Sequence, residues 1–146
     1  MRILVQRSKK SSVSVNNKIV GSINNGLVLL VGFTHTDTKS DIVKLAKKVV
    51  NLRIFDDENG VMNKSLLDIG GQILSISQFT LYGDSTKGNR PSYIGAMKGD
   101  NAINLYNEFN DELRKYGVIV ETGKFGAMMD VKINNYGPTT IWLESR

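Results

Sequence analysis

The first third of the chain alternates hydrophobic and polar residues in the way that half-buried strands do. Residues 3–7 and 13–15 show this alternation, and residues 18–23 form another short run of the same kind. That run ends at Asn24-Asn25-Gly26, and an Asn-Gly pair is typical of a tight hairpin turn. Residues 27–33 are apolar apart from one glycine, which predicts a strand buried on both faces.

Two segments repeat their apolar residues at helical spacing. Residues 38–52 place isoleucine, leucine and valine on one face and lysines on the other, and Thr38 or Ser40 can cap the start. Residues 100–116 carry a second apolar face, and Gly117 follows where a left-handed C-cap is expected. The pattern therefore predicts two helices.

The rest of the chain indicates further strands separated by turns and one long loop. An acidic turn at residues 56–60 separates two short apolar runs, and residues 83–100 are rich in Gly, Ser, Asn and Lys. Loops of more than about 12–15 residues in compact domains are usually functional or mobile. The remaining strands are expected at residues 72–79, 118–121, 128–133 and 139–143.

Together these elements predict one β-rich α/β domain over residues 1–146. Its mixed sheets form a layered β/β/α core or a barrel-like core, with two helices packed on one side. No internal repeat or linker interrupts the chain, and 146 residues are enough for one domain of ordinary size.

Composition narrows the possible functions. There is no cysteine and only one histidine, His35, which excludes thiol nucleophiles, Cys-ligated metals and any site that needs two imidazoles. The longest apolar run, residues 27–31, is far shorter than the ~20 residues of a membrane span, and the start does not resemble a secretory signal. We expect a cytoplasmic protein with no membrane association. The net charge of +5 favours an anionic partner.

Common catalytic signatures are missing. The chain contains no phosphate-binding Gly-x-x-x-x-Gly-Lys loop, no Gly-x-Ser-x-Gly elbow and no His-Glu-x-x-His motif. His35 ends an apolar strand with no nucleophile near it in sequence, so a turn histidine is favoured over a general base. The acidic turn lacks the spacing of a calcium loop and is interpreted as a hairpin tip.

One run that could carry chemistry is Ser77-Gln78-Phe79-Thr80-Leu81, at the end of the expected strand 72–79. Backbone N–H groups become free where a strand opens into a loop, and free N–H groups can stabilise a developing oxyanion. Thr80 could act as a nucleophile, but it would need an adjacent base, which the sequence does not supply. That Ser77 and Thr80 merely end a strand remains equally open.

A second run, residues 134–140, contains Gly137-Pro138. A Gly-Pro pair between strands usually forms a turn. If the bond were cis, its two carbonyls could point the same way and form a rigid backbone wall. Because Gly137 has no Cβ, a ligand could approach that wall closely.

With several other short motifs, these two runs resemble the D-aminoacyl-tRNA deacylase family. The resemblance spans essentially the whole chain, in the family's order, and the combination of Ser-Gln-x-x-Leu with a late Gly-Pro is specific. The residues that carry it are Arg7, Asn51-Leu52-Arg53-Ile54-Phe55, Met62-Asn63, Ser77-Gln78-Phe79-Thr80-Leu81, Gly88, Arg90-Pro91-Ser92, Thr122-Gly123, Phe125, Asn135, Gly137-Pro138 and Thr140.

The resemblance implies a hydrolase that cleaves the ester between a D-amino acid and the 3′ end of tRNA, without a metal or another cofactor. It implies a closed homodimer in which the partner's Gly137-Pro138 completes each site and Arg7 braces that dipeptide. The opposite wall would consist of Ser77, Gln78, Phe79 and Thr80. By the same resemblance, Phe125 and Met129 would lie near the terminal adenosine.

The residues fit this chemistry in physical terms. An aminoacyl ester is already activated, so positioning and backbone oxyanion donors can suffice, and the family's mechanism has the 2′-OH of the terminal ribose assist. We therefore expect Thr80 to position first and to act as a nucleophile second. A rigid wall that clashes with the L-side Cβ rejects L-substrates but passes glycine, so cleavage of glycyl-tRNA is expected. Lys87, Arg90 and Lys98 are candidate tRNA phosphate contacts, although a solvated loop cation is the favoured interpretation of each.

Two other functions remain open from the residues. A non-catalytic RNA-binding module would bind uncharged RNA without turnover. A small esterase with Thr80 as nucleophile would form a trappable acyl-enzyme and would be indifferent to the nucleic acid.

Overall fold

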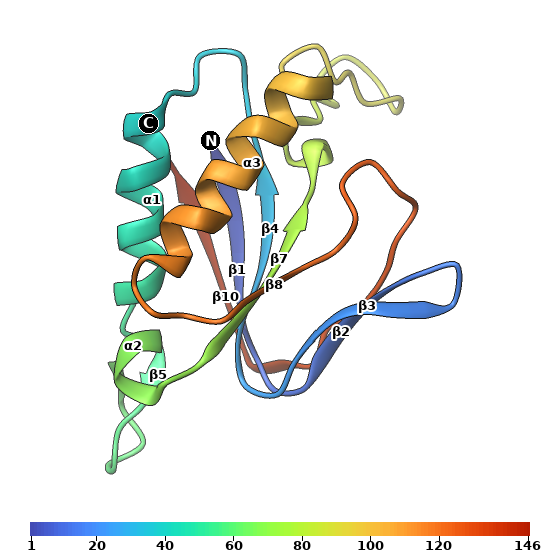
Figure 1. Cartoon of the computed structure of the whole chain (residues 1–146). Helices are drawn as coiled ribbons and strands as arrows, with labels where there is room; N and C mark the ends of the chain where they lie inside the picture. The colour runs from blue at the N-terminus through green and yellow to red at the C-terminus, as the bar shows by residue number, and fades with distance from the viewer.

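The structure is a computed structural model that describes residues 1–146 as a single α/β domain with mixed sheets and three helices (Figure 1). Its helices are α1 (Lys39–Asn51), α2 (Leu66–Ile69) and α3 (Gly99–Arg114), with a 3₁₀ helix η1 (Phe79–Tyr82). The strands are β1 (Arg2–Ser8), β2 (Ser11–Val15), β3 (Lys18–Ile23), β4 (Gly26–Gly32), β5 (Phe55–Asp56), β6 (Met62–Lys64), β7 (Gln72–Ser77), β8 (Val120–Thr122), β9 (Asp130–Lys132) and β10 (Asn135–Glu144).

The main sheet has five strands in the order β10-β1-β4-β7-β8. β1 is antiparallel to both β4 and β10, whereas β7 runs parallel to β4 and β8 runs parallel to β7. A second sheet has the order β3-β2-β9, and β5 with β6 forms a small hairpin. In this order β10 and β8 are the two edges of the main sheet, so the sheet is open.

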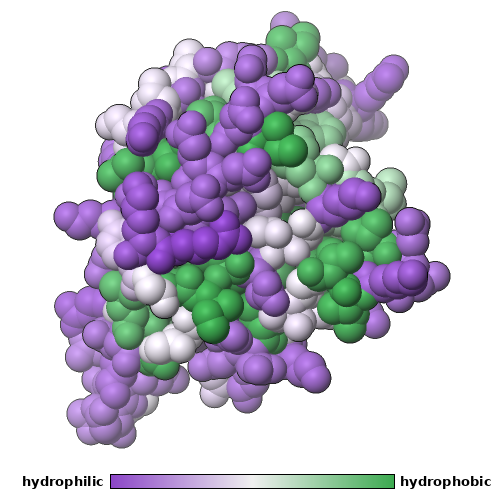
Figure 2. Space-filling view, viewed as in Figure 1, coloured by the Kyte–Doolittle hydropathy of each residue, from purple (hydrophilic) through white to green (hydrophobic).

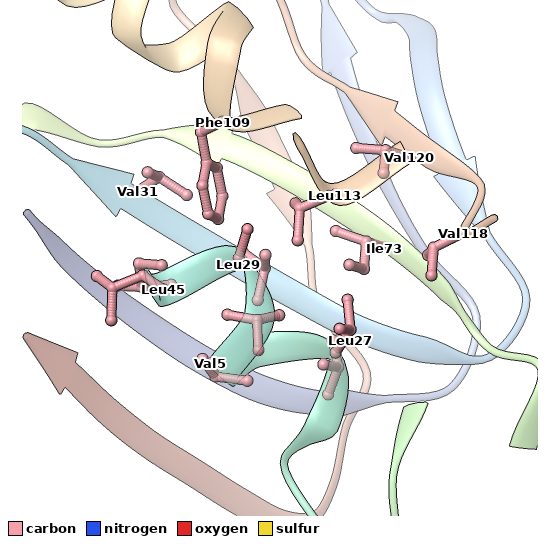
Figure 3. Packing of buried hydrophobic residues seen from close by; sticks show 14 of the residues in the cluster. Val5, Leu27, Leu29, Val31, Leu45, Ile73, Phe109, Leu113, Val118 and Val120 are labelled. Carbon is pink, nitrogen blue, oxygen red and sulfur yellow. The ribbon is translucent and has the colours of Figure 1, made fainter. Parts of the chain in front are cut away.

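The hydrophobic core occupies both faces of the main sheet. On one face, Leu29 and Ile73 pack with Leu45 of α1 and Phe109 of α3 in one cluster of 21 buried residues (Figure 3). On the other face, a second cluster joins Val28, Leu74 and Ile76 of the main sheet to Val13 and Ile23 of the second sheet. The domain is therefore layered as helices, main sheet and second sheet. The apolar run of β4 is buried on both faces because it lies between two layers.

The expectation of two helices was wrong by one. α1 and α3 lie where the helical periodicity predicts them and cover the same face of the main sheet (Figure 1). The additional helix, α2, has only four residues, too few to show a periodicity. Its signal is a capping box, in which Ser65 and Asp68 each accept a hydrogen bond from the other's backbone N–H. No helix has both the length and the apolar character that crossing a bilayer would require.

The hairpin expected at Asn24-Asn25-Gly26 was also wrong. That segment leads from β3 in one sheet to β4 in the other. The tight turn lies instead at Asn16 and Asn17, which join β2 to β3 with positive φ values of 50° and 64°. Gly26 serves a different purpose: a Cβ there would lie 1.9 Å from the carbonyl oxygen of Gln72, so glycine lets β4 approach β7.

Two element boundaries near the candidate residues differ from the sequence pattern. β7 ends at Ser77, and the residues from Phe79 onward form η1 instead of extending the strand. β10 begins at Asn135, so Gly137-Pro138 lies inside an edge strand and not in a turn between strands. An edge strand tolerates this proline because the missing N–H faces away from the sheet or into a bulge.

Candidate functional site

A cavity of about 460 Å³ opens at the carboxyl ends of the parallel strands β4 and β7. Ligands of open α/β sheets bind at this end of the strands. The cavity is lined by 16 residues, of which 11 are hydrophobic. The candidate residues that it brings together are Ser77, Gln78, Phe79, Thr80, Phe125 and Met129.

The floor of the cavity forms where β7 turns into η1. The backbone N–H of Gln78 donates to the Val31 carbonyl at 2.7 Å, which extends the β4–β7 ladder by one residue. The chain then turns across the end of β4, against Gly32. A Cβ on Gly32 would lie 2.8 Å from the Gln78 carbonyl oxygen, so the close packing of η1 depends on that glycine.

The start of η1 lines the cavity and carries backbone N–H groups that are not used within the helix. Its first internal hydrogen bond runs from the Leu81 N–H to the Gln78 carbonyl, at 3.3 Å. The N–H groups of Phe79 and Thr80 come before that bond and have no partner within the helix. The site can therefore offer two adjacent main-chain donors to an oxyanion.

The side chains of the cavity supply no acid–base pair. No Asp, Glu, His or Lys is among its lining residues. The Thr80 hydroxyl oxygen accepts a short hydrogen bond from the Gln78 side-chain amide. This contact orients the hydroxyl, but an amide cannot remove a proton from it. The arrangement is suited to binding an apolar group and positioning a bond, and less suited to activating a side-chain nucleophile.

The opposite wall comes from the loop between β8 and β9, which carries Phe125 and Met129. The ring of Phe125 lies 5.8 Å from the ring of Tyr106 on α3. The Tyr106 hydroxyl donates to the Ser75 carbonyl at 2.7 Å, which ties α3 to β7, and burial raises the pKa of Tyr106. These contacts anchor the wall to the core.

An aromatic pair with a lysine stands at the rim of the cavity. Phe79 and Tyr93 meet edge to face, with ring centroids 5.2 Å apart. The ammonium of Lys98 lies 4.8 Å from the Phe79 centroid, within the range of a cation–π contact. Lys87 and Arg90 are exposed on the loop before α3 and do not line the cavity.

Apolar side chains are unusually exposed near this rim. Ile94 is 86% exposed and Met128 is 92% exposed. Figure 2 shows apolar groups reaching the surface on the side where the β8–β9 loop and the β2–β3 hairpin lie. Met97 and Met128 also line the cavity and were not predicted to, because a methionine in a loop carries no periodic signal.

Gly137 and Pro138 lie in a bulge of β10. The peptide bond between them is cis, and the register with β1 shifts between Gln6, opposite Thr140, and Ser8, opposite Asn135. The Asn135 side-chain amide spans this bulge, donating to the Thr139 carbonyl at 3.0 Å and to a β1 carbonyl at 3.0 Å. The bulge is therefore held to β1 by side-chain hydrogen bonds where the ladder is interrupted.

Arg7 lies directly behind the bulge and is only 7% exposed. Its guanidinium donates to the Tyr136 carbonyl at 3.0 Å and to the Ile54 carbonyl at 2.9 Å, and forms an ion pair with Asp56 at 3.1 Å. A Cβ on Gly137 would lie 2.7 Å from Nη2 of Arg7, and Gly137 has a φ of +117°. Glycine is thus required here on grounds of both space and backbone conformation.

The bulge and the cavity lie at opposite ends of β1. Arg7, beside the bulge, pairs with Leu27 at the start of β4, whereas Arg2 pairs with Gly32 beside η1. Five residues at about 3.3 Å each separate these ends by roughly 17 Å along the strand. The structure therefore brings six of the nine candidate residues into the cavity and leaves Arg7, Gly137 and Pro138 outside it.

The two remaining sequence candidates have local structural roles. The exposed ring of His35 lies with Nε2 3.0 Å from the Ile94 carbonyl, which holds the loop before α3 against the end of β4. In the acidic turn, Asp57 accepts hydrogen bonds from the backbone N–H groups of Asn59 and Val61, and these bonds lower its pKa. Asp57 therefore caps its own turn.

Comparison with known proteins connects both regions to one group of sequences. Residues 4–144 match the family model described as D-Tyr-tRNA(Tyr) deacylase. Proteins named D-aminoacyl-tRNA deacylase from Bacillus cytotoxicus and Bacillus cereus are each 60% identical over 146 residues, covering 100% of both chains.

Two solved structures resemble the fold. One, named c-Myc DNA Unwinding Element Binding Protein, has a TM-score of 0.94 and 40% identity, covering 100% of this chain and 99% of that one. The other is a probable eukaryotic D-amino acid tRNA deacylase with a TM-score of 0.82 and 20% identity, covering 97% of each chain. At that identity the second similarity concerns the fold alone.

Proposed function

Since this chain is a hydrolase that belongs to the D-aminoacyl-tRNA deacylase family, we propose that the cavity receives the aminoacylated 3′ end of tRNA and that the ester is cleaved over η1. The observation that carries this assignment is the composition of the cavity. Six candidate residues from two distant segments line it, and none of its lining residues is a base. Such a site suits a substrate that is already reactive.

Catalysis in this proposal depends on positioning and on main-chain donors. The N–H groups of Phe79 and Thr80 bind the carbonyl oxygen as it becomes an oxyanion, and loss of one such donor costs ~10²–10³ in rate in other hydrolases. The 2′-OH of the terminal ribose assists the attack. Phe125 and Met129 hold the terminal adenosine against the apolar wall.

Thr80 acts as a positioning residue in this account. Its oxygen already accepts the Gln78 amide hydrogen bond, and no base is close enough to deprotonate it. A side chain held in this way can orient the substrate near the donors of η1. A trappable acyl-enzyme on Thr80 would contradict this role.

Each site is completed by a second copy of the chain. Gly137-Pro138 lies roughly 17 Å along β1 from the cavity end, too far to contact a ligand in the cavity of its own chain. It lies on β10, one of the two edges of the main sheet, where Tyr136 and Trp142 are each 46% exposed. We assign this region to a homodimer interface, with Arg7 bracing the bulge from behind.

Selection against L-substrates follows from the backbone wall that Gly137-Pro138 forms in this proposal. A single methyl group changes binding in an apolar pocket by only ~1–3 kcal/mol, whereas a clash with immobile main chain excludes a substrate outright. The wall is placed to meet the Cβ of an L-residue. Glycine has no Cβ, so mischarged glycyl-tRNA is also cleaved.

In this proposal the protein binds the tRNA body through contacts to its phosphates. It acts in the cytoplasm, in translation quality control. The net charge of +5 favours this partner, and Lys98 stands at the cavity rim, with Lys87 and Arg90 farther along the same loop. The logarithm of the tRNA binding constant falls linearly with the logarithm of the salt concentration. Removing a lysine that contacts phosphate should make that slope shallower by roughly one unit.

The test is hydrolysis of matched D-tyrosyl-tRNA and L-tyrosyl-tRNA, with glycyl-tRNA as a third substrate. Cleavage of the D-ester and of glycyl-tRNA, with the L-ester spared, is expected. Binding without turnover would instead indicate an RNA-binding module. Equal cleavage of both tyrosyl esters, or of a simple acyl ester lacking the nucleic acid, would indicate a general esterase.

A further inference from the structure

Arg2, at the start of β1, joins the hydrolytic element η1 to the edge strand β10. Its Nη1 donates to the carbonyl oxygen of Leu81 in η1 at 2.9 Å. Its Nε donates to Oε1 of Glu144 in β10 at 2.7 Å. One guanidinium thus bonds to two residues, Leu81 and Glu144, that are more than sixty positions apart in sequence.

The faces of the same guanidinium lie against aromatic rings from those two elements. Its central carbon is 4.4 Å from the ring centroid of Tyr82 and 5.6 Å from that of Trp142. A planar guanidinium can stack on rings while its edge donates hydrogen bonds, which a lysine ammonium cannot do. The Arg2 guanidinium therefore donates hydrogen bonds from its edge and contacts aromatic rings with its faces.

The element that Arg2 contacts needs support from outside. η1 has only four residues, and the last carbonyls of so short a helix lack partners within it. Phe79 packs against Tyr93 but remains 44% exposed, so the outer surface of the turn is only partly covered. On the inner side η1 rests on Gly32, whose register partner on β1 is Arg2. Arg2 and Gly32 therefore hold the same turn from adjacent strands.

We propose that Arg2 is a positioning residue of the hydrolytic site, which fixes η1 so that its first N–H groups face the substrate carbonyl. This role rests on the proposed function of the cavity. Arg2 does not touch the substrate: it acts through the Leu81 carbonyl and the Tyr82 ring. Through Glu144 and Trp142 it also sets the position of η1 relative to the strand that carries Gly137-Pro138.

The decisive variant is Arg2→Met, which keeps an unbranched side chain and removes every donor. A small displacement of catalytic groups can cost up to about 100-fold, so we expect kcat for D-tyrosyl-tRNA to fall between about 10- and 100-fold. KM should stay within about twofold, because the wall from the β8–β9 loop, which holds the terminal adenosine in the proposed function, is unchanged. Arg2→Lys should recover part of kcat, since its ammonium can still donate to Leu81 but lacks the planar group whose separate nitrogens bond to Leu81 and Glu144.

Arg114 offers a matched control at the far end of α3. It too pairs with a carboxylate, Asp111 at 3.0 Å, and donates to a backbone carbonyl, that of Val120 at 3.1 Å. Arg114→Met should lower stability as much as Arg2→Met does and leave kcat unchanged. Equal losses of kcat in both variants would overturn the proposal, because they would reflect a general loss of stability.

Amide hydrogen exchange at residues 79–83 gives a measurement that does not depend on turnover. Faster exchange there in Arg2→Met, with α1 unchanged, is expected. If the parent protein cleaved no D-aminoacyl-tRNA while these amides responded, the proposed function would fail and the fixing of η1 by Arg2 would stand. If turnover were normal in Arg2→Met and the amides did not respond, the role of Arg2 would fail alone.

If Arg2→Met does not fold, Glu144→Gln replaces it. This change removes the charge that orients the guanidinium while leaving the Leu81 bond, and we expect a roughly threefold loss of kcat. A kcat equal to that of the parent, with unaltered exchange at residues 79–83, would overturn the proposal.

Discussion

The cavity at the end of β7 and the bulge on β10 are built in opposite ways. The cavity is lined mainly by apolar side chains, with the polar side chains of Ser77, Gln78 and Thr80 and the main chain at the start of η1 among them. The bulge is exposed at Gly137 and Pro138 and is held from behind by a buried arginine, Arg7, and by the amide of Asn135. In the proposed function the cavity binds the substrate and the bulge of a second copy excludes L-substrates, so each region supplies only part of a selective hydrolase.

In both regions the proposed function relies on main-chain groups, which a mutation cannot remove directly. Main-chain groups at η1 and at Gly137 persist through most substitutions, so their positions depend on the side chains and glycines around them. In the cavity that support comes from Gly32 and Arg2, and at the bulge it comes from Arg7. Substitutions of the supporting residues should therefore have larger effects than substitutions of hydroxyls within the cavity.

The largest effect is expected for Gly137→Ala. The new Cβ would lie 2.7 Å from Nη2 of Arg7, at a φ of +117° that L-residues rarely adopt. The wall must shift, and we expect kcat/KM for D-tyrosyl-tRNA to fall by about 100-fold.

Gly60→Ala is the matched control for this change. Gly60 also has a positive φ, +73°, but a Cβ there would meet nothing within 4 Å. It should lose some stability and keep its activity. If Gly137→Ala were as active as Gly60→Ala, the bulge would have no part in the reaction.

Arg7→Met should have the next largest effect, on stability. The carbonyls of Tyr136 and Ile54 would lose their donors in a region that is largely buried, at a cost of about 1–3 kcal/mol in the free energy of unfolding. Loss of the ion pair with Asp56 adds little to this cost, because the Asp56 side chain is 43% exposed and stays solvated. Urea unfolding measures the change.

Arg53→Met provides the comparison for Arg7, since the exposed Arg53 donates only to the Asn63 carbonyl at 2.9 Å. Arg53→Met should lower the free energy of unfolding by less than about 0.5 kcal/mol. Equal losses at Arg7 and Arg53 would contradict the supporting role of Arg7.

Thr80→Ala should change activity little. Its hydroxyl accepts one hydrogen bond from Gln78 and has no base beside it, so we expect kcat to fall by no more than about fivefold. A 2′-deoxy terminal adenosine should lose most of its cleavage with the parent protein. The reverse pattern, with Thr80→Ala inactive and the deoxy substrate cleaved, would make Thr80 the nucleophile.

The smallest effect concerns the pH dependence of the Arg2–Glu144 pair. The hydrogen bond from Arg2 lowers the pKa of Glu144 below its ordinary value of 4.5. A lowered pKa stabilises the folded state above that ordinary value, and the stabilisation disappears as pH falls through the folded-state pKa. Glu144→Gln should thus cost up to about 0.5 kcal/mol at pH 7, because the pair is partly exposed, and this cost should disappear as pH falls through the folded-state pKa. A cost that persisted at low pH would mean that the ion pair is not its source.

Periodicity and turn chemistry predicted much of the fold. The helical faces of α1 and α3 and the doubly buried strand β4 stand close to where the sequence placed them. The turn at Asn16 and Asn17 was missed because an Asn-Gly pair nearby gave a stronger hairpin signal, although Gly26 serves the contact with Gln72. α2 was missed because four residues show no periodicity.

The candidate site was only partly accessible from local patterns. Ser77-Gln78-Phe79-Thr80 could be singled out because it follows an apolar alternation, but Met97 and Met128 reach the cavity only through the tertiary fold. Gly137-Pro138 reads as a turn because a proline rarely continues a strand. Its place in an edge strand depends on the bulge opposite Gln6 and Ser8, which no sequence spacing reveals.

The most direct test of the account asks whether the cavity of one chain works with the bulge of another. Met129→Trp fills the cavity and leaves the bulge intact, whereas Gly137→Ala distorts the bulge and leaves the cavity intact. The homodimer of each variant should therefore be nearly inactive. Because a symmetric dimer has two equivalent sites, random exchange of subunits should restore about a quarter of the parental activity, from one intact site in each mixed dimer. If mass measurement showed mixed dimers and the activity stayed at the level of the separate variants, the two regions would not complete each other.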